Sequence, residues 1–174
     1  APALVRQVVP KPIALPTLTE VLRRLVEERT SIRDLRTILE ALAAKVASVH
    51  GANHPELVEV HRLVKAVHED LSPHMMKEER VLFPAIHAAA GGEREFPFGT
   101  LDNPIRMMVF EHEATGELLD ELRSVTDDYR LPADACASYT SLFQRLDEME
   151  RDTHLHIHKE NHILFPAALR LLDS

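Results

Sequence analysis

The chain has 174 residues, of which 45% are hydrophobic and 28% are charged, and its formal net charge is −8. This composition is typical of a single globular domain with its own core, and the acidic balance argues against a nucleic-acid partner. The single cysteine excludes an internal disulfide framework and is typical of a reducing compartment, and no apolar run approaches the roughly 20 residues of a membrane span. We therefore expect a cytoplasmic protein without a membrane partner. Scarce glycine and abundant leucine, alanine, glutamate and arginine favour helices.

The amino-terminal residues 1–16 contain four prolines, which prevent a regular helix: Pro2, Pro10, Pro12 and Pro16. They predict an extended arm, and residues 17–174 then form the bundle domain. Thr17 or Thr19 can cap a first helix that runs to about His50, where a turn is expected.

The second helix is expected from near His54 to about Ala90. Pro73 falls inside it and removes one backbone hydrogen bond, so the sequence predicts a kink or a break there. Ser72 is placed to cap a restarted helix after such a break.

Two further helices follow a loop at residues 91–103. One is expected from about Pro104 to Asp127 and the other over about residues 135–172, with a linker at residues 131–134 between them. Four long helices joined by short loops predict an all-α fold, an antiparallel up-down four-helix bundle.

One sequence pattern, HxxKExx[VI]LFPA, occurs twice, beginning at His74 and at His156. In each copy a glutamate follows the histidine by four residues, at Glu78 and Glu160, which places both side chains on one helical face about a turn apart. Imidazoles and carboxylates from paired helices are the ligands with which bundle proteins hold two irons. A single such pair is more often a solvated helical turn, but the repetition with the same apolar tail favours a metal site.

The candidate ligands lie on seams where the helical period calls for apolar residues. His112 occupies such a position on the third helix, between Met108 and Thr115. On the second and fourth helices the ligands continue apolar lines of three- and four-residue steps: Leu57, Val60, Val64, Val67 and Leu71, and Tyr139, Leu142, Leu146 and Met149. Burying imidazoles and carboxylates costs several kcal/mol unless something compensates, and a cation compensates best.

The remaining histidines and the cysteine are interpreted as structural. The four-residue steps between His154, His158 and His162 place them on a stripe that points away from His156, which indicates a solvated face, with adventitious metal binding as the alternative. Surface positions are expected for four others: His54, His61, His68 and His87. We interpret Cys136 as a structural residue; the alternative is a reactive thiol.

His50 is expected at the end of the bundle remote from the metal site. In an antiparallel bundle the first helix meets the ligand turn of the second near its own start. His50 lies roughly 21 residues further on, about 30 Å along the axis.

From about residue 32 to 172 the chain resembles hemerythrin-like (HHE) proteins, specifically the branch that repairs iron centres in bacterial nitrosative stress. The matching stretches are LEALAAKVASVHG, HMMKEERVLFPAI, NPIRMMVFEHEATGELL, PADACASY and HIHKENHILFPAAL. The resemblance implies a non-haem di-iron centre with an oxo or hydroxo bridge, and a role in restoring iron–sulfur clusters damaged by nitric oxide or peroxide. It implies Glu78 and Glu160 as bridging ligands, with His74, His112 and His156 as terminal ligands.

The first helix departs from that family. The family places a histidine ligand about 21 residues before the VHG stretch, which falls here on Arg29, and arginine stays protonated and cannot bind a metal. Glu28 is the only polar residue on the apolar seam of this helix, so we expect it as a substitute ligand; the alternative is a salt bridge to an arginine. Residues 2–43 are more similar to a segment of the export-gate protein of flagellar and type III secretion systems.

Three hypotheses on function follow. The first is a di-iron stress protein in iron–sulfur repair or nitric-oxide chemistry, with O2 or NO as a small ligand and iron–sulfur proteins as partners. The second is a hemerythrin-like module that binds or senses O2 or NO without turnover. The third is a bundle that holds one metal ion or zinc because a ligand is missing. Whether the protein is an enzyme stays open at this point.

Overall fold

The computed structural model describes residues 37–172. Its regular structure is helical, apart from an isolated bridge between Phe96 and Gly99. After a helix at residues 37–50, the elements are α2 (Glu56–Lys77), η2 (Glu78–Leu82), α3 (Phe83–Ala90), α4 (Asp102–Val125), α5 (Ala137–Lys159), η3 (Glu160–Leu164) and α6 (Phe165–Leu172). The predicted arm, the start of the first helix, Glu28 and Arg29 lie outside the described residues.

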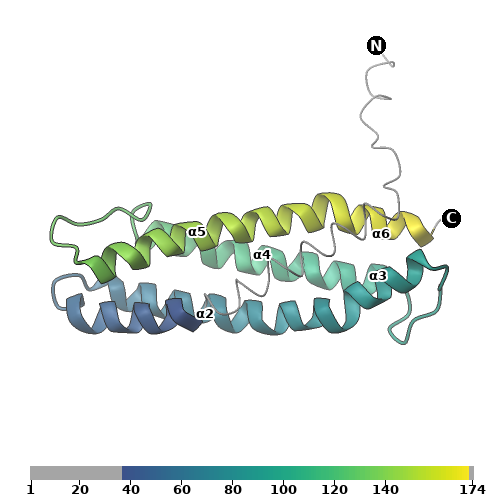
Figure 1. Cartoon of the computed structure of the whole chain (residues 1–174), viewed down its shortest axis with the longest axis horizontal. Coiled ribbons are helices and arrows are strands. Elements are labelled where there is room, and N and C mark those ends of the chain that lie inside the picture. Colours follow the sequence, from purple (N-terminus) through teal and green to yellow (C-terminus); the bar gives the residue numbers. More distant parts are fainter. Residues whose placement is uncertain (1–36, 173–174) are drawn as a thin grey trace, which may run out of the picture.

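These elements form four rods packed side by side (Figure 1). One rod is α2 with α3, a second is α4, which returns in the opposite direction, and a third is α5 with α6, which runs parallel to the first. The helix at residues 37–50 belongs to the fourth rod. The predicted all-α, antiparallel up-down four-helix bundle is confirmed.

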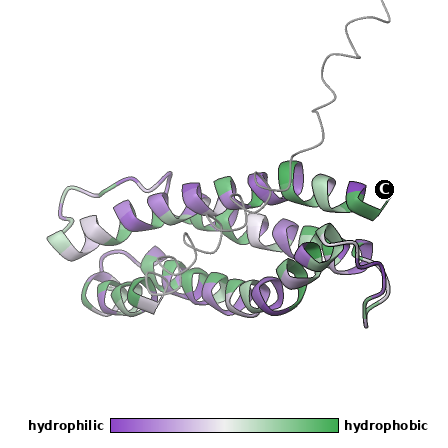
Figure 2. Ribbon diagram, turned by 45° about the vertical axis from the view of Figure 1, so that its right-hand side comes forward, coloured by the Kyte–Doolittle hydropathy of each residue, from purple (hydrophilic) through white to green (hydrophobic). Residues whose placement is uncertain are grey.

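The helices are amphipathic, with hydrophobic and hydrophilic residues alternating along each ribbon (Figure 2). Their buried apolar residues form two clusters. One lies between the helix at residues 37–50, the amino-terminal parts of α2 and α5 and the carboxy-terminal part of α4, and it reaches Leu71 and Met149. The other begins at Leu82, Met108 and Leu164 and extends to the opposite end of the bundle. Between these clusters, each of the three fully described rods carries buried polar residues.

The predicted helix break at Pro73 is wrong, because α2 continues without interruption from Glu56 to Lys77. The Ser72 hydroxyl does not cap a new helix but donates a 2.7 Å hydrogen bond to the His68 carbonyl. Pro73 is exposed, while Leu71 and Met75 on either side are buried. The packing of this apolar face therefore outweighs the single backbone hydrogen bond that proline removes.

Two π-helical turns, which the sequence analysis did not predict, begin at the two glutamates of the repeated pattern. The amide of Phe83 donates to the carbonyl of Glu78, five residues back, and Phe165 does the same to Glu160. The next residue in each copy is a proline, whose ring would clash with the carbonyl four residues before it. A turn widened by one residue relieves that clash and re-aims the side chains around it.

Candidate metal centre

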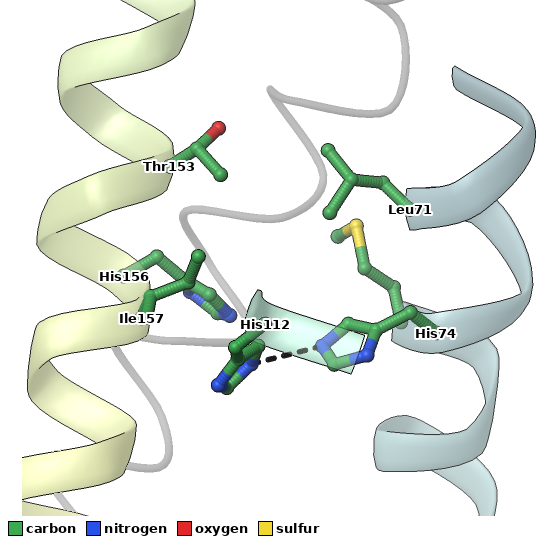
Figure 3. A pocket seen from close by; sticks show the side chains of 7 residues that line it. Leu71, His74, His112, Thr153, His156 and Ile157 are labelled. Carbon is green, nitrogen blue, oxygen red and sulfur yellow. Dashed lines mark hydrogen bonds between the residues drawn. The ribbon is translucent and has the colours of Figure 1, made fainter. Parts of the chain in front are cut away.

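Four acidic and imidazole side chains converge in the polar layer between the two apolar clusters: His74, Glu78, His112 and Glu160. One ligand atom of each lies within 4.8 Å of the others, and all four residues are buried. They come from α2, η2, α4 and η3, so three of the four rods meet here. Figure 3 shows His74, His112 and His156 facing one another across the space between α2 and α5.

Glu160 contacts two of the histidines with its two oxygen atoms. Its Oε2 lies 3.2 Å from Nε2 of His112, and its Oε1 lies 3.4 Å from Nε2 of His156. On the opposite rod, Oε1 of Glu78 lies 3.3 Å from Nε2 of His74. Both carboxylates have zero solvent exposure, so solvent does not neutralise their charge.

The outer nitrogens of two histidines face oxygen acceptors. Nδ1 of His74 lies 2.9 Å from Oε2 of Glu111, which also accepts an ion-paired hydrogen bond from Lys77. Nδ1 of His112 lies 2.9 Å from Oδ1 of Asn161. Such partners place the proton of a neutral imidazole on Nδ1 and leave the lone pair on Nε2, as in protein metal sites.

The apolar tail of the pattern also orients a ligand. The ring of Phe165 lies nearly parallel to that of His112, with an interplanar angle of 5° and centroids 5.9 Å apart. Together with Asn161, this contact fixes the plane of the His112 imidazole. The second copy of the pattern therefore holds a histidine that belongs to another helix.

The donor set fits a cation. Nε2 of His74 and Nε2 of His112 lie 3.2 Å apart, the contact drawn as a dashed line in Figure 3. When both protons reside on Nδ1, two lone pairs face each other here, an arrangement that needs a proton or a positive ion between them. Imidazoles and carboxylates suit first-row transition metals, and inward histidines and glutamates on facing helices suit two irons. A non-haem di-iron centre is the cofactor that this chemistry fits.

Protonation favours the same conclusion. Burial acts to raise the pKa of Glu160, but the close contacts of its two oxygens with His112 and His156 outweigh burial and hold that pKa well below the ordinary value. Burial likewise acts to raise the pKa of Glu111, and Lys77 and His74 lower it overall. Both carboxylates are therefore anionic at neutral pH and can bind a cation without first losing a proton.

A small cavity of about 20 Å³ opens onto the three imidazoles. Leu71, Met75, Thr153 and Ile157 form the rest of its wall (Figure 3). A volume of this size holds one water molecule or a ligand of similar size.

The other histidines lie outside this cluster. As expected, His50 lies at the remote end, with Nε2 3.1 Å from Sγ of the exposed Cys136. The stripe of His154, His158 and His162 is exposed, as the sequence predicted.

Two of the expected surface histidines join separate parts of the chain instead. His54 and His68 are half-buried: Nε2 of His54 lies 3.0 Å from Asp134, and Nδ1 of His68 lies 2.7 Å from Glu40. Each is a single imidazole beside carboxylates, and neither is part of the central cluster.

The sequence analysis missed the residues that orient the histidines, namely Glu111, Lys77 and Asn161. A signal for them was present, since the lysine recurs in both copies of the pattern. Glu111 directly precedes His112, and Asn161 directly follows Glu160. Neighbours of a ligand on a helix point to different faces, however, and only the packing shows which face meets which histidine.

The chain belongs to the hemerythrin family: residues 20–168 match the Hemerythrin HHE cation binding domain. It is similar to the iron-sulfur cluster repair protein ScdA of Staphylococcus haemolyticus, with 36% identity over 127 residues, covering 73% of this chain and 56% of the relative. It is similar also to the iron-sulfur cluster repair protein YtfE of Dickeya chrysanthemi, with 37% identity over 129 residues, covering 74% of this chain and 55% of the relative.

The chain thus spans little more than half the length of these relatives. The family match begins at residue 20, so it includes much of the segment at residues 2–43 that resembles an export-gate protein. That second resemblance stays a prediction. None of the helices among residues 37–172 is long and apolar enough to cross a membrane.

Proposed function

We propose that this protein is a di-iron protein of nitrosative and oxidative stress that takes part in the repair of damaged iron–sulfur clusters. The observation that carries the proposal is the buried convergence of His74, Glu78, His112 and Glu160. The relatives named for iron–sulfur cluster repair support the biological role. Iron–sulfur proteins are then the macromolecular partners.

In this proposal five side chains bind the irons: His74, Glu78, His112, His156 and Glu160. Glu160 is suited to bridge two ions, because its two oxygens already face two different histidines. Glu78 is the matching bridge from the first copy of the pattern. When bound, the di-iron centre supplies redox-active iron with a coordination position open to a diatomic ligand such as O2 or NO.

The remaining residues hold the ligands in place and limit the entry of water. Glu111 and Asn161 fix the tautomers of His74 and His112 through their Nδ1 atoms. Leu71, Met75 and Ile157 leave room for only one small molecule beside the imidazoles. An apolar wall of this kind admits a neutral diatomic molecule more readily than a charged solute.

The first helix completes the proposed ligand set through Glu28. The 2.7 Å contact between the side chains of Glu40 and His68 sets the register of these two antiparallel helices. A residue a given number of positions before Glu40 is then expected at the same level along the bundle as the residue the same number of positions after His68. Ten steps lead to Glu78 on one helix and position 30 on the other. If the helix continues at this register, Glu28 lies within one turn of the glutamate's level.

A second candidate function is binding or sensing of O2 or NO without turnover. The small apolar cavity beside the three imidazoles favours it, since that cavity is large enough for a diatomic ligand but not for a bulky substrate.

One experiment separates the two. An iron–sulfur enzyme inactivated with nitric oxide is incubated with the iron-loaded protein, and recovery of its activity is measured. Recovery is expected with the loaded protein and not with His74→Ala, while His50→Ala serves as the matched control and should behave as wild type. If the absorption spectrum shows that the protein binds NO but the protein restores no enzyme activity, repair is refuted and the binding function stands.

A further inference from the structure

The outward face of the third rod, which contains α5, η3 and α6, carries a second set of imidazoles. His154, His158 and His162 follow one another at four-residue steps from α5 into η3, and all three are exposed. His158 is two residues from His156, which corresponds to about 200° around a helix. The face therefore points almost opposite to the buried centre.

Within this set, His154 already has a partner. Its Nε2 lies 3.5 Å from Oε1 of Glu150, a buried carboxylate that also accepts hydrogen bonds from Arg123 and Tyr129. His158 and His162 instead lie against each other, with ring centroids 4.5 Å apart and an interplanar angle of 22°. These two rings form a pair at the surface.

The backbone favours one tautomer of His162. Its Nδ1 lies 3.3 Å from the carbonyl oxygen of His158, which can only accept a hydrogen bond. The proton of the neutral ring is therefore on Nδ1, and the lone pair is on Nε2, the nitrogen directed away from the backbone. A backbone carbonyl behind Nδ1 is a common outer partner of metal-binding histidines.

We propose that His158 and His162 form a second, exposed site for a divalent late first-row cation such as Ni²⁺, Cu²⁺ or Zn²⁺. Two histidines four residues apart on one helical face can bind the same ion, as in the HExxH helices of zinc enzymes. The stacked rings already lie within reach of each other, and their exposure leaves the side chains able to turn both Nε2 atoms toward one ion. Water completes the coordination.

The donor type sets the selectivity. The pair offers imidazole nitrogen and no carboxylate, so it disfavours Mg²⁺ and Ca²⁺, which require oxygen ligands. Cu²⁺ should bind more tightly than either Ni²⁺ or Zn²⁺. This site is independent of the proposed function, because none of its side chains belongs to the buried cluster.

The test is a calorimetric titration of the iron-loaded protein with Ni²⁺, so that the buried centre is already filled. One additional equivalent of Ni²⁺ should bind, and His158→Asn and His162→Asn should each weaken it by about tenfold or more, since even outer partners of a metal site account for 10- to 100-fold in affinity. The exposed His87 provides the control, and His87→Asn should leave the affinity unchanged.

The absorption spectrum of the iron is followed in the same titration. An unchanged spectrum is expected. The proposal is overturned if Ni²⁺ binds the His158→Asn variant as well as wild type, if no Ni²⁺ binds, or if Ni²⁺ displaces the iron and so occupies the buried centre. Failure of cluster repair in the separate assay leaves the Ni²⁺ result untouched.

Discussion

In the half of the bundle that contains the metal centre, here called the metal end, three histidines and two glutamates are buried together. At the remote end His50, His54, Cys136 and Asp134 meet near the surface. Both groups combine imidazoles with acidic partners at about 3 Å. At the remote end His50 contacts Cys136, His54 contacts Asp134 and Glu56, and both rings pack against the buried Tyr139. At the metal end the same chemical groups converge on a common centre.

The difference shows that burial and convergence, more than residue type, create the demand for a metal. An exposed imidazole–carboxylate pair is hydrated and contributes little to stability, with or without a cation. Buried carboxylates and facing Nε2 lone pairs cannot be hydrated, so a cation is what compensates their desolvation. Five tests of this comparison follow, beginning with the largest expected effect.

Removal of a ligand at the metal end should have the largest effect. His74→Ala and His156→Ala should each lower the bound iron to about half of the wild-type content or less, because each removes a terminal ligand. His50→Ala at the remote end should leave iron unchanged. Iron analysis with protein quantification measures this, and loss of iron in His50→Ala would contradict the antiparallel geometry.

Iron should also stabilise the fold. At a free iron concentration about 1,000 times Kd, binding to the native state should raise the free energy of unfolding by about 4 kcal/mol relative to the iron-free protein. For a chain of 174 residues this corresponds to a rise in Tm of roughly 8–16 °C. Differential scanning calorimetry measures the shift. Equal Tm values for the two forms would count against the burial of these carboxylates and imidazoles at the site.

Neutralising Glu111, the carboxylate that faces Nδ1 of His74, should have a smaller effect. Glu111→Gln keeps the shape of the side chain but removes the charge that faces Nδ1 of His74 and Nζ of Lys77. We expect iron affinity to fall by about 10- to 100-fold, the usual loss for an outer partner. Competition with a chelator measures it. Glu113→Gln, on an exposed part of the same helix, is the matched control and should bind iron as wild type does.

Substitutions in the first helix test whether this helix supplies a metal ligand. Arg29→His should raise the iron content toward two per chain, and Glu28→Gln should lower it, because an amide is a poorer ligand for iron than a carboxylate. Both variants are read by iron analysis beside wild type. If neither changes the iron content, the first helix does not present this turn to the site, and the register extended from Glu40 and His68 is wrong.

Much of the metal end could be predicted from sequence because its constraints are local. The four-residue step from His74 to Glu78 fixes a shared helical face, and the repeat at His156 and Glu160 fixes the partner. The bundle followed from apolar periodicity, and the remote position of His50 followed from helix length alone.

The rest depends on packing between segments distant in sequence. The π turns follow from the Phe-Pro tails only when the preceding residues are already helical. The sequence analysis expected this helix to end at Asp127, whereas α4 ends two residues earlier, at Val125. The residues that follow leave the helical conformation, with φ angles of 50° at Asp127, 64° at Asp128 and 56° at Tyr129. Such angles are costly without glycine, and a tertiary contact, the 2.5 Å hydrogen bond from Tyr129 to Glu150, holds this turn.

The smallest expected effect is a pH dependence at the remote end. The hydrogen bond to Asp134 raises the pKa of His54 above its ordinary 6.5, with a further contribution from Glu56. A raised folded-state pKa means that this stabilisation is fully present below pH 6.5 and is lost as pH rises through the folded value. His54→Gln should therefore be less stable than wild type at pH 6, and the difference should shrink by pH 8.5. Urea unfolding at both values measures it, with His87→Gln as the exposed control. A constant difference would mean that His54 contributes by packing on Tyr139 rather than by charge.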